Sequence, residues 1–215
     1  MRAKINLSVL VSGGGSNLQA ILDGIDSGTI ANARVALVIS SNPDAFALTR
    51  ARKFGVETAV VSAAIFPRES RRTERMSELL SKAKTDAIIL AGYMSILPAE
   101  IVRAYEGRIL NIHPSLIPRH CGKGYYGKRV HRAVLDAGDS ESGATVHFVD
   151  EGVDTGEIIL QRKTPVLPGD TVDALAARVL KVEHEIIVEA VARTCATLSE
   201  RNAEESAGGA DDGTG

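Results

Sequence analysis

The sequence predicts an α/β fold, a single doubly wound, mainly parallel sheet flanked by helices. In the first half of the chain, runs rich in Val, Ile and Leu alternate with stretches of helical periodicity, a pattern typical of parallel sheets. The run at 87–91 is apolar throughout, as expected for a central strand covered on both faces. A length of 215 residues fits one domain.

The elements of the first half follow from these runs and from the periodic stretches between them. Strands are expected at 5–11, 35–40, 58–61, 86–91 and 108–112. Helices are expected at about 17–25, 44–54, 68–83 and 98–105.

The second half is expected to extend the same sheet. A loop containing Gly and Tyr (119–127) and a short helix (128–137) precede two strand-like segments at 144–149 and 157–166. A final helix follows Asp170, a candidate cap. We predict a catalytic domain at 1–197 and an acidic, disordered tail at 198–215, because that segment has no apolar period to bury.

Composition excludes several classes of function. A net charge of −2 gives no reason to expect nucleic acid as a partner, and the first apolar run is too short to span a membrane. Sparse cysteines, Cys121 and Cys195, fit a reducing cytoplasm without a structural disulfide. No metal is expected, because none of the candidate ligands has a diagnostic spacing: His113, His120, Cys121, His131 and His147.

A glycine-rich loop at 12–17 follows the first strand and opens the first helix. Its amides and the helix N-terminus would converge on an anion, and a phosphate monoester is the natural ligand. Leu18 stands where a dinucleotide fingerprint has its third glycine, which disfavours a dehydrogenase. The alternative is a tight turn whose glycines merely permit positive φ.

Asn111 and His113 emerge on one face of a strand that Pro114 ends. An amide donor beside a titratable ring suits a reaction that builds negative charge on an oxygen and moves a proton. Asp154 lies between two glycines that would let a loop bend its carboxylate toward the imidazole, raising the ring's pKa and fixing its tautomer. An ordinary Asx-turn at Asp154 is the alternative.

Four segments, 9–21, 90–97, 110–118 and 143–156, together resemble the folate-dependent glycinamide ribonucleotide formyltransferases. The motifs are Ser-Gly-x-Gly-Ser-Asn, Asn-x-His-Pro-Ser-Leu and the later Asp, and the likeness covers roughly 5–192. The resemblance implies transfer of the formyl group of 10-formyltetrahydrofolate to the amine of phosphoribosylglycinamide, in purine synthesis. The implied partners are these two small molecules. The sequence does not distinguish a monomer from a homodimer.

The resemblance also implies roles for individual residues. Asn111 donates to the developing oxyanion, His113 stabilises it and moves a proton, and Asp154 raises the pKa of His113 and organises a relaying water. Four residues match the positions at which the family contacts its ribonucleotide substrate: Gly15, Ser16 and Asn17 for the phosphate, and Glu183 for the ribose hydroxyls. The resemblance also implies that six residues contact the folate: Arg68, Met94, Ser95, Ile96, Leu97 and Asp150.

The chain departs from the family's pattern in three places. Ser95 stands where many relatives have Arg, and Leu180 where they have a basic or amide residue, for which Lys181 could compensate at the phosphate. The loop at 119–127 is longer than usual and is either a mobile lid or a well-packed insertion. Two other functions remain open, a formyltetrahydrofolate hydrolase and a non-catalytic phosphometabolite-binding or folate-binding module.

Overall fold

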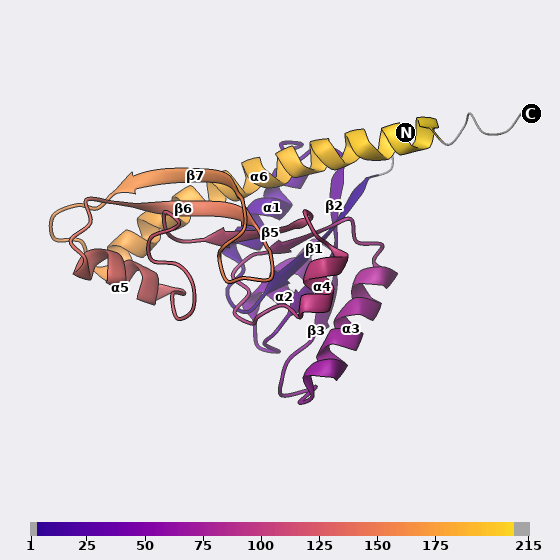
Figure 1. Ribbon diagram of the computed structural model, residues 1–215, viewed down its shortest axis with the longest axis horizontal. Coiled ribbons are helices and arrows are strands. Elements are labelled where there is room, and N and C mark those ends of the chain that lie inside the picture. Colours follow the sequence, from indigo (N-terminus) through magenta and orange to yellow (C-terminus); the bar gives the residue numbers. More distant parts are fainter. Residues whose placement is uncertain (1–3, 209–215) are drawn as a thin grey trace, which may run out of the picture.

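The computed structural model describes residues 4–208, which form a seven-stranded sheet flanked by helices (Figure 1). The strands are β1 (Ile5–Val11), β2 (Ala33–Ser40), β3 (Glu57–Val60), β4 (Ala87–Leu90), β5 (Ile109–His113), β6 (Glu141–Phe148) and β7 (Ile158–Pro165). The helices are α1 (Ser16–Asp26), α2 (Phe46–Lys53), α3 (Glu69–Lys82), α4 (Ala99–Ala104), α5 (Lys128–Asp136) and α6 (Val172–Gly208).

The strand order is β3-β2-β1-β4-β5-β6-β7. The first five strands pair in parallel, whereas β6 pairs antiparallel with both β5 and β7. The order reverses beside β1, so the chain winds outward in both directions from the centre. The predicted fold class is therefore confirmed, and the carboxyl ends of β1, β4 and β5 share one edge of the sheet.

The sheet is covered on both faces, as continuous apolar strands require. Alternate residues of β1 point to opposite sides: Val9 and Val11 belong to a core shared with α1, α2 and α6, and Leu10 belongs to a second core shared with α3 and α4. Figure 1 shows α6 running along one side of the sheet, with α3 and α4 on the other. Because helices pack on both faces of the sheet, the strand ends that carry the polar side chains described below are held in place.

Helix α6 corrects the predicted disordered tail. The helix begins after Thr171, whose hydroxyl accepts the amide of Ala174, so Thr171 rather than Asp170 caps it. It continues past 198 to Gly208, with Leu198 buried in the core, because Ala, Glu and Arg are good helix formers and extending an existing helix costs little. The rest of the predicted tail, 209–215, lies outside the described residues.

None of the helices that the structure describes combines the length and apolar character needed to cross a membrane.

Candidate active site

A cavity of about 790 Å³ opens at the carboxyl ends of the central strands. It gathers most of the side chains that the sequence singled out. Those that line it are Asn17, Met94, Ser95, Ile96, Leu97, Asn111, His113, Asp150, Asp154 and Glu183. Gly15, Ser16 and Arg68 are not among the residues that line it.

Strand β5 presents Asn111 and His113 to this cavity, because residues two apart in a strand share a face. His113 is buried and its Nε2 lies 3.0 Å from the carbonyl oxygen of His120. A carbonyl can only accept, so Nε2 carries a hydrogen. The other ring nitrogen, Nδ1, lies 3.6 Å from Oδ2 of Asp154, which confirms the predicted meeting of imidazole and carboxylate.

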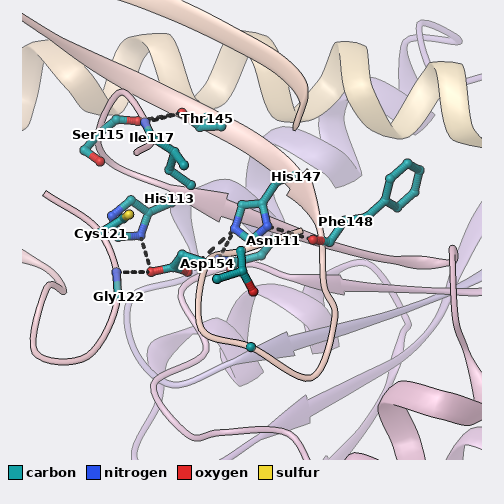
Figure 2. Close-up of polar contacts among 12 residues, drawn as sticks. Asn111, His113, Ser115, Ile117, Cys121, Gly122, Thr145, His147, Phe148 and Asp154 are labelled. Atoms are coloured by element: carbon teal, nitrogen blue, oxygen red, sulfur yellow. Dashed lines mark hydrogen bonds and ion pairs between the residues drawn. The ribbon is translucent and has the colours of Figure 1, made fainter. Parts of the chain in front are cut away.

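The loop between β6 and β7 brings Asp154 to this position (Figure 2). Asp154 adopts a left-handed backbone conformation with φ 57°, and its Oδ2 accepts the amide of Gly122 at 2.8 Å. The flanking glycines allow close approaches: a Cβ on Gly152 would lie 2.0 Å from Oγ1 of Thr155, and one on Gly156 would lie 1.8 Å from the carbonyl oxygen of Phe148. The expectation that glycines bend this loop into the site is therefore confirmed.

Electrostatics at the pair differ from the prediction. Burial lowers the pKa of His113, and the raising effects of the His120 carbonyl and of Asp154 do not overcome it. The prediction that the pKa of His113 is raised is therefore wrong, although the charge of Asp154 does act to raise it. Burial raises the pKa of the Asp154 carboxyl, but hydrogen bonds from His147 and Gly122 outweigh it and hold the pKa below its usual range.

His147 is a member of the site that sequence reasoning considered only as a metal ligand. In the β5–β6 pairing it stands opposite Asn111, and Nδ2 of Asn111 lies 3.1 Å from its Nε2 and 3.4 Å from Oδ1 of Asp154 (Figure 2). Nδ1 of His147 lies 2.8 Å from the carbonyl oxygen of Phe148, which can only accept, so Nδ1 donates to it. The sequence held no signal for this register.

The glycine-rich loop turns tightly from β1 into α1. Gly15 precedes α1 with φ 72°, and a Cβ there would lie 2.5 Å from Cβ of Ala47, so the position requires glycine. No side chain among the described residues caps α1, which leaves its first amides available. Arg50 donates through Nε to the carbonyl of Gly14 at 2.8 Å and places positive charge beside the loop, a contribution that the sequence did not reveal.

Asn17 and Glu183 meet in the cavity although 166 positions separate them. Nδ2 of Asn17 donates to Oε2 of Glu183 at 2.7 Å, and burial raises the pKa of this carboxyl. The Oδ1 atom of Asn17 is buried without a hydrogen-bond partner in the described part of the chain. A buried polar pair with unused hydrogen-bonding capacity is suited to hold a polar ligand.

The predicted folate segment lines the cavity with apolar side chains that are open to solvent, Met94 at 54% and Ile96 at 85% exposed. The amide of Met94 donates to Oγ of Ser12 at 2.8 Å, which ties this segment to the glycine-rich loop. Asp150 makes the Asx-turn that was the alternative for Asp154, because its Oδ1 accepts from Gly152. Arg68 is exposed at the start of α3.

Among the described residues, no group of three or more His, Cys, Asp or Glu side chains could hold a metal ion. The long loop does enter the site, since six of its residues line the cavity: Gly122, Lys123, Gly124, Tyr125, Tyr126 and Gly127.

Comparison with known proteins agrees with this geometry. The family model for formyl transferases matches residues 5–191. The chain therefore belongs to the formyl transferase family.

Within that family, the chain resembles the phosphoribosylglycinamide formyltransferases. The protein of that name from Escherichia coli (strain K12) is 42% identical over 182 residues, which cover 85% of this chain and 83% of that protein. A chloroplastic one from Vigna unguiculata is 41% identical over 88% of this chain, which spans 60% of that relative. The crystal structure of glycinamide ribonucleotide transformylase 1 from Symbiobacterium toebii superimposes with a TM-score of 0.84, at 43% identity, covering 90% of this chain and 89% of that one.

Proposed function

We propose that this protein transfers the formyl group of 10-formyltetrahydrofolate to the amine of 5-phosphoribosylglycinamide, giving formylglycinamide ribonucleotide and tetrahydrofolate. The observation that carries the proposal is the contact between Asn111, His113 and Asp154 inside one large cavity, in a chain of this family. The similar proteins named above support this substrate pair.

The reaction needs alignment and charge stabilisation rather than a protein nucleophile, because the substrate amine attacks the formyl carbon itself. A C–N bond forms, the formyl oxygen becomes negative, and collapse breaks the bond to the folate nitrogen. Asn111 is suited to donate to that oxygen, since its long 3.4 Å contact with Asp154 is the one a ligand oxygen would replace. His113 and a water organised by Asp154 carry the amine proton to the folate nitrogen.

The two substrates occupy different parts of the site in this proposal, with the phosphate at the glycine-rich loop beside the cavity and the folate inside it. The glycine-rich loop at 13–17 and the N-terminus of α1 hold the phosphate, with Arg50 adding positive charge. Glu183 accepts hydrogen bonds from the ribose hydroxyls. Met94, Ile96 and Leu97 form an apolar wall for the folate, and Asp150 shapes the loop that carries Asp154.

Three further assignments belong to this proposal. Arg68 does not line the cavity, so its folate contact stays a prediction. Lys181 is exposed on α6, and its compensation for Leu180 at the phosphate also stays a prediction. A cytoplasmic location agrees with the free thiols of Cys121 and Cys195.

A steady-state assay tests the function. Purified protein is mixed with 10-formyltetrahydrofolate, and the absorbance of the folate product is followed with and without the ribonucleotide. We expect turnover only with the ribonucleotide, and a loss of about 10²- to 10³-fold in kcat for Asn111→Ala. Lys163→Ala, which removes an exposed pair with Glu141 away from the cavity, is the control.

The same assay separates the alternatives. Equal turnover without the ribonucleotide would indicate a formyltetrahydrofolate hydrolase, in which water replaces the amine. No turnover, together with tight binding of either substrate, would indicate a binding module.

A further inference from the structure

The carbonyl of His120, which holds Nε2 of His113, belongs to the long loop that departs from the family's pattern. His120 has φ 51°, a conformation that is unfavourable for a residue with a side chain, so its surroundings must hold it there. Because the proposed function places His113 at the reacting groups, whatever fixes the His120 carbonyl also fixes the orientation of the catalytic ring.

The side chain of His120 is fixed by Asp139, which lies between α5 and β6. Nε2 of His120 lies 2.7 Å from Oδ2 of Asp139, and the guanidinium of Arg119 donates to the other carboxylate oxygen. The Asp139 side chain is only 7% exposed and that of His120 14%, whereas that of Arg119 is 62% exposed. The His120 link is therefore the one that solvent screens least.

Two further contacts anchor the same segment. Oγ of the fully buried Ser115 donates to the carbonyl of Arg119 at 2.6 Å, and the amide of Gly122 donates to Asp154 at 2.8 Å. Residues 119–122 thus connect a buried carboxylate outside the cavity to both His113 and Asp154 within it. Asp139 does not line the cavity.

We propose that Asp139 is a positioning residue for the transfer reaction, acting through the side chain of His120 to hold the carbonyl that orients His113 and keeps a hydrogen on its Nε2. This inference rests on the proposed function. It makes the first part of the unusual loop a fixed support for the catalytic ring rather than a freely moving lid.

The test compares Asp139→Asn, His120→Ala and the double variant in the steady-state assay. His120→Ala keeps the backbone carbonyl and removes only its anchor. We expect each single variant to lose about tenfold to a hundredfold in kcat, with KM for both substrates changed less than about threefold. The double variant should be no worse than the more impaired single variant, because both changes break one link.

Two controls separate positioning from general destabilisation. Asp170→Asn removes a carboxylate that is 5% exposed and paired with Arg178 away from the cavity, so it should lower the Tm while leaving kcat unchanged. Arg119→Ala removes the exposed partner of Asp139 and should have a smaller effect than His120→Ala.

A ¹⁵N NMR spectrum of the histidine side chains adds a readout that a purely structural role would not move. The wild type should show His113 with its hydrogen on Nε2, and Asp139→Asn should populate the other tautomer.

Unchanged kcat and an unchanged tautomer in both single variants would overturn the inference. If Asp139→Asn fails to fold, His120→Ala alone decides. Full activity of His113→Ala would instead refute the proposed function.

Discussion

Burial and a neighbouring carboxylate act on His113 in opposite directions, and burial prevails. A ring that stays neutral near pH 7 can accept a proton from the attacking amine. Asp154 limits the fall, since its charge favours the protonated ring. For the proposed reaction, the pair therefore combines a neutral ring that can take up a proton with a fixed orientation of that ring.

Replacing the carboxylate of Asp154 should lower the pKa of His113 further. In Asp154→Asn the carboxylate charge no longer opposes the effect of burial, so the pKa of His113 should fall below its value in the wild type. An NMR titration of the His113 ring measures this directly. A higher or unchanged pKa of His113 would show that the charge of Asp154 does not favour the protonated ring.

The depressed pKa values also predict how stability depends on pH. Burial lowers the pKa of His113 and of His131 below the ordinary 6.5, so at lower pH the unfolded chain binds more protons than the folded one. The free energy of unfolding should therefore keep its full value above pH 6.5, where both rings are neutral in either state. It should decrease as the pH falls below 6.5. His131→Gln should reduce that decline in urea unfolding measured from pH 7.5 to 5.5. An equally steep decline in the variant would contradict the assignment.

At the scale of elements, the turn between β1 and α1 depends on one backbone conformation. Gly15→Ala places a Cβ 2.5 Å from Cβ of Ala47 at φ 72°, so the loop must shift away from α2. We expect a lower Tm and a higher KM for the ribonucleotide, with kcat changed less. The measurement is a thermal melt together with a ribonucleotide titration.

Gly28→Ala is the matched control for that substitution. Gly28 also has a positive φ, 80°, but nothing lies within 4 Å of its Cβ position. It should show only the backbone cost, about 1–2 kcal/mol, with no change in KM. Equal effects of the two variants on KM would remove the argument for a close approach at Gly15.

The elements themselves were largely predictable, because apolar runs and helical periodicity report local burial. The β1–α1 loop, the β5 strand end and the glycine-flanked Asp154 all lie where the sequence indicated. The pairing of His147 with Asn111 was not predictable, since antiparallel register depends on a loop whose path the sequence does not encode locally. The same holds for Arg50 and Asp139, whose contacts are made across the fold.

At the scale of the molecule, α6 joins the two halves of the sheet. It packs against α1, α5, β6 and β7 and carries Glu183 into the cavity. The predicted end of the domain at 197 stopped one residue short of buried Leu198 because the sequence beyond it is polar and gives no apolar period. The helix nevertheless continues, so polarity alone was a poor guide to its end.

Truncation tests how much of α6 the fold needs. Ending the chain after Glu200 should leave the Tm nearly unchanged, because Leu198 is the last buried residue among those of α6 whose side chains are described. Ending it after Ala190 removes the buried Val191, Cys195 and Leu198 and should cost roughly 4 kcal/mol or more. Circular dichroism melts of both forms measure the difference. Equal melting temperatures would contradict this account of the core.

The central claim is that the formyl group passes to an amine rather than to water. The most direct measurement follows the carbon itself, with 10-[¹³C]formyltetrahydrofolate, phosphoribosylglycinamide and enzyme observed by ¹³C NMR. We expect the label to appear as a formamide on the ribonucleotide, at a rate that falls at least about a hundredfold in His113→Ala. Label that accumulates as free formate, or transfer that proceeds equally well without the His113 ring, would contradict the account.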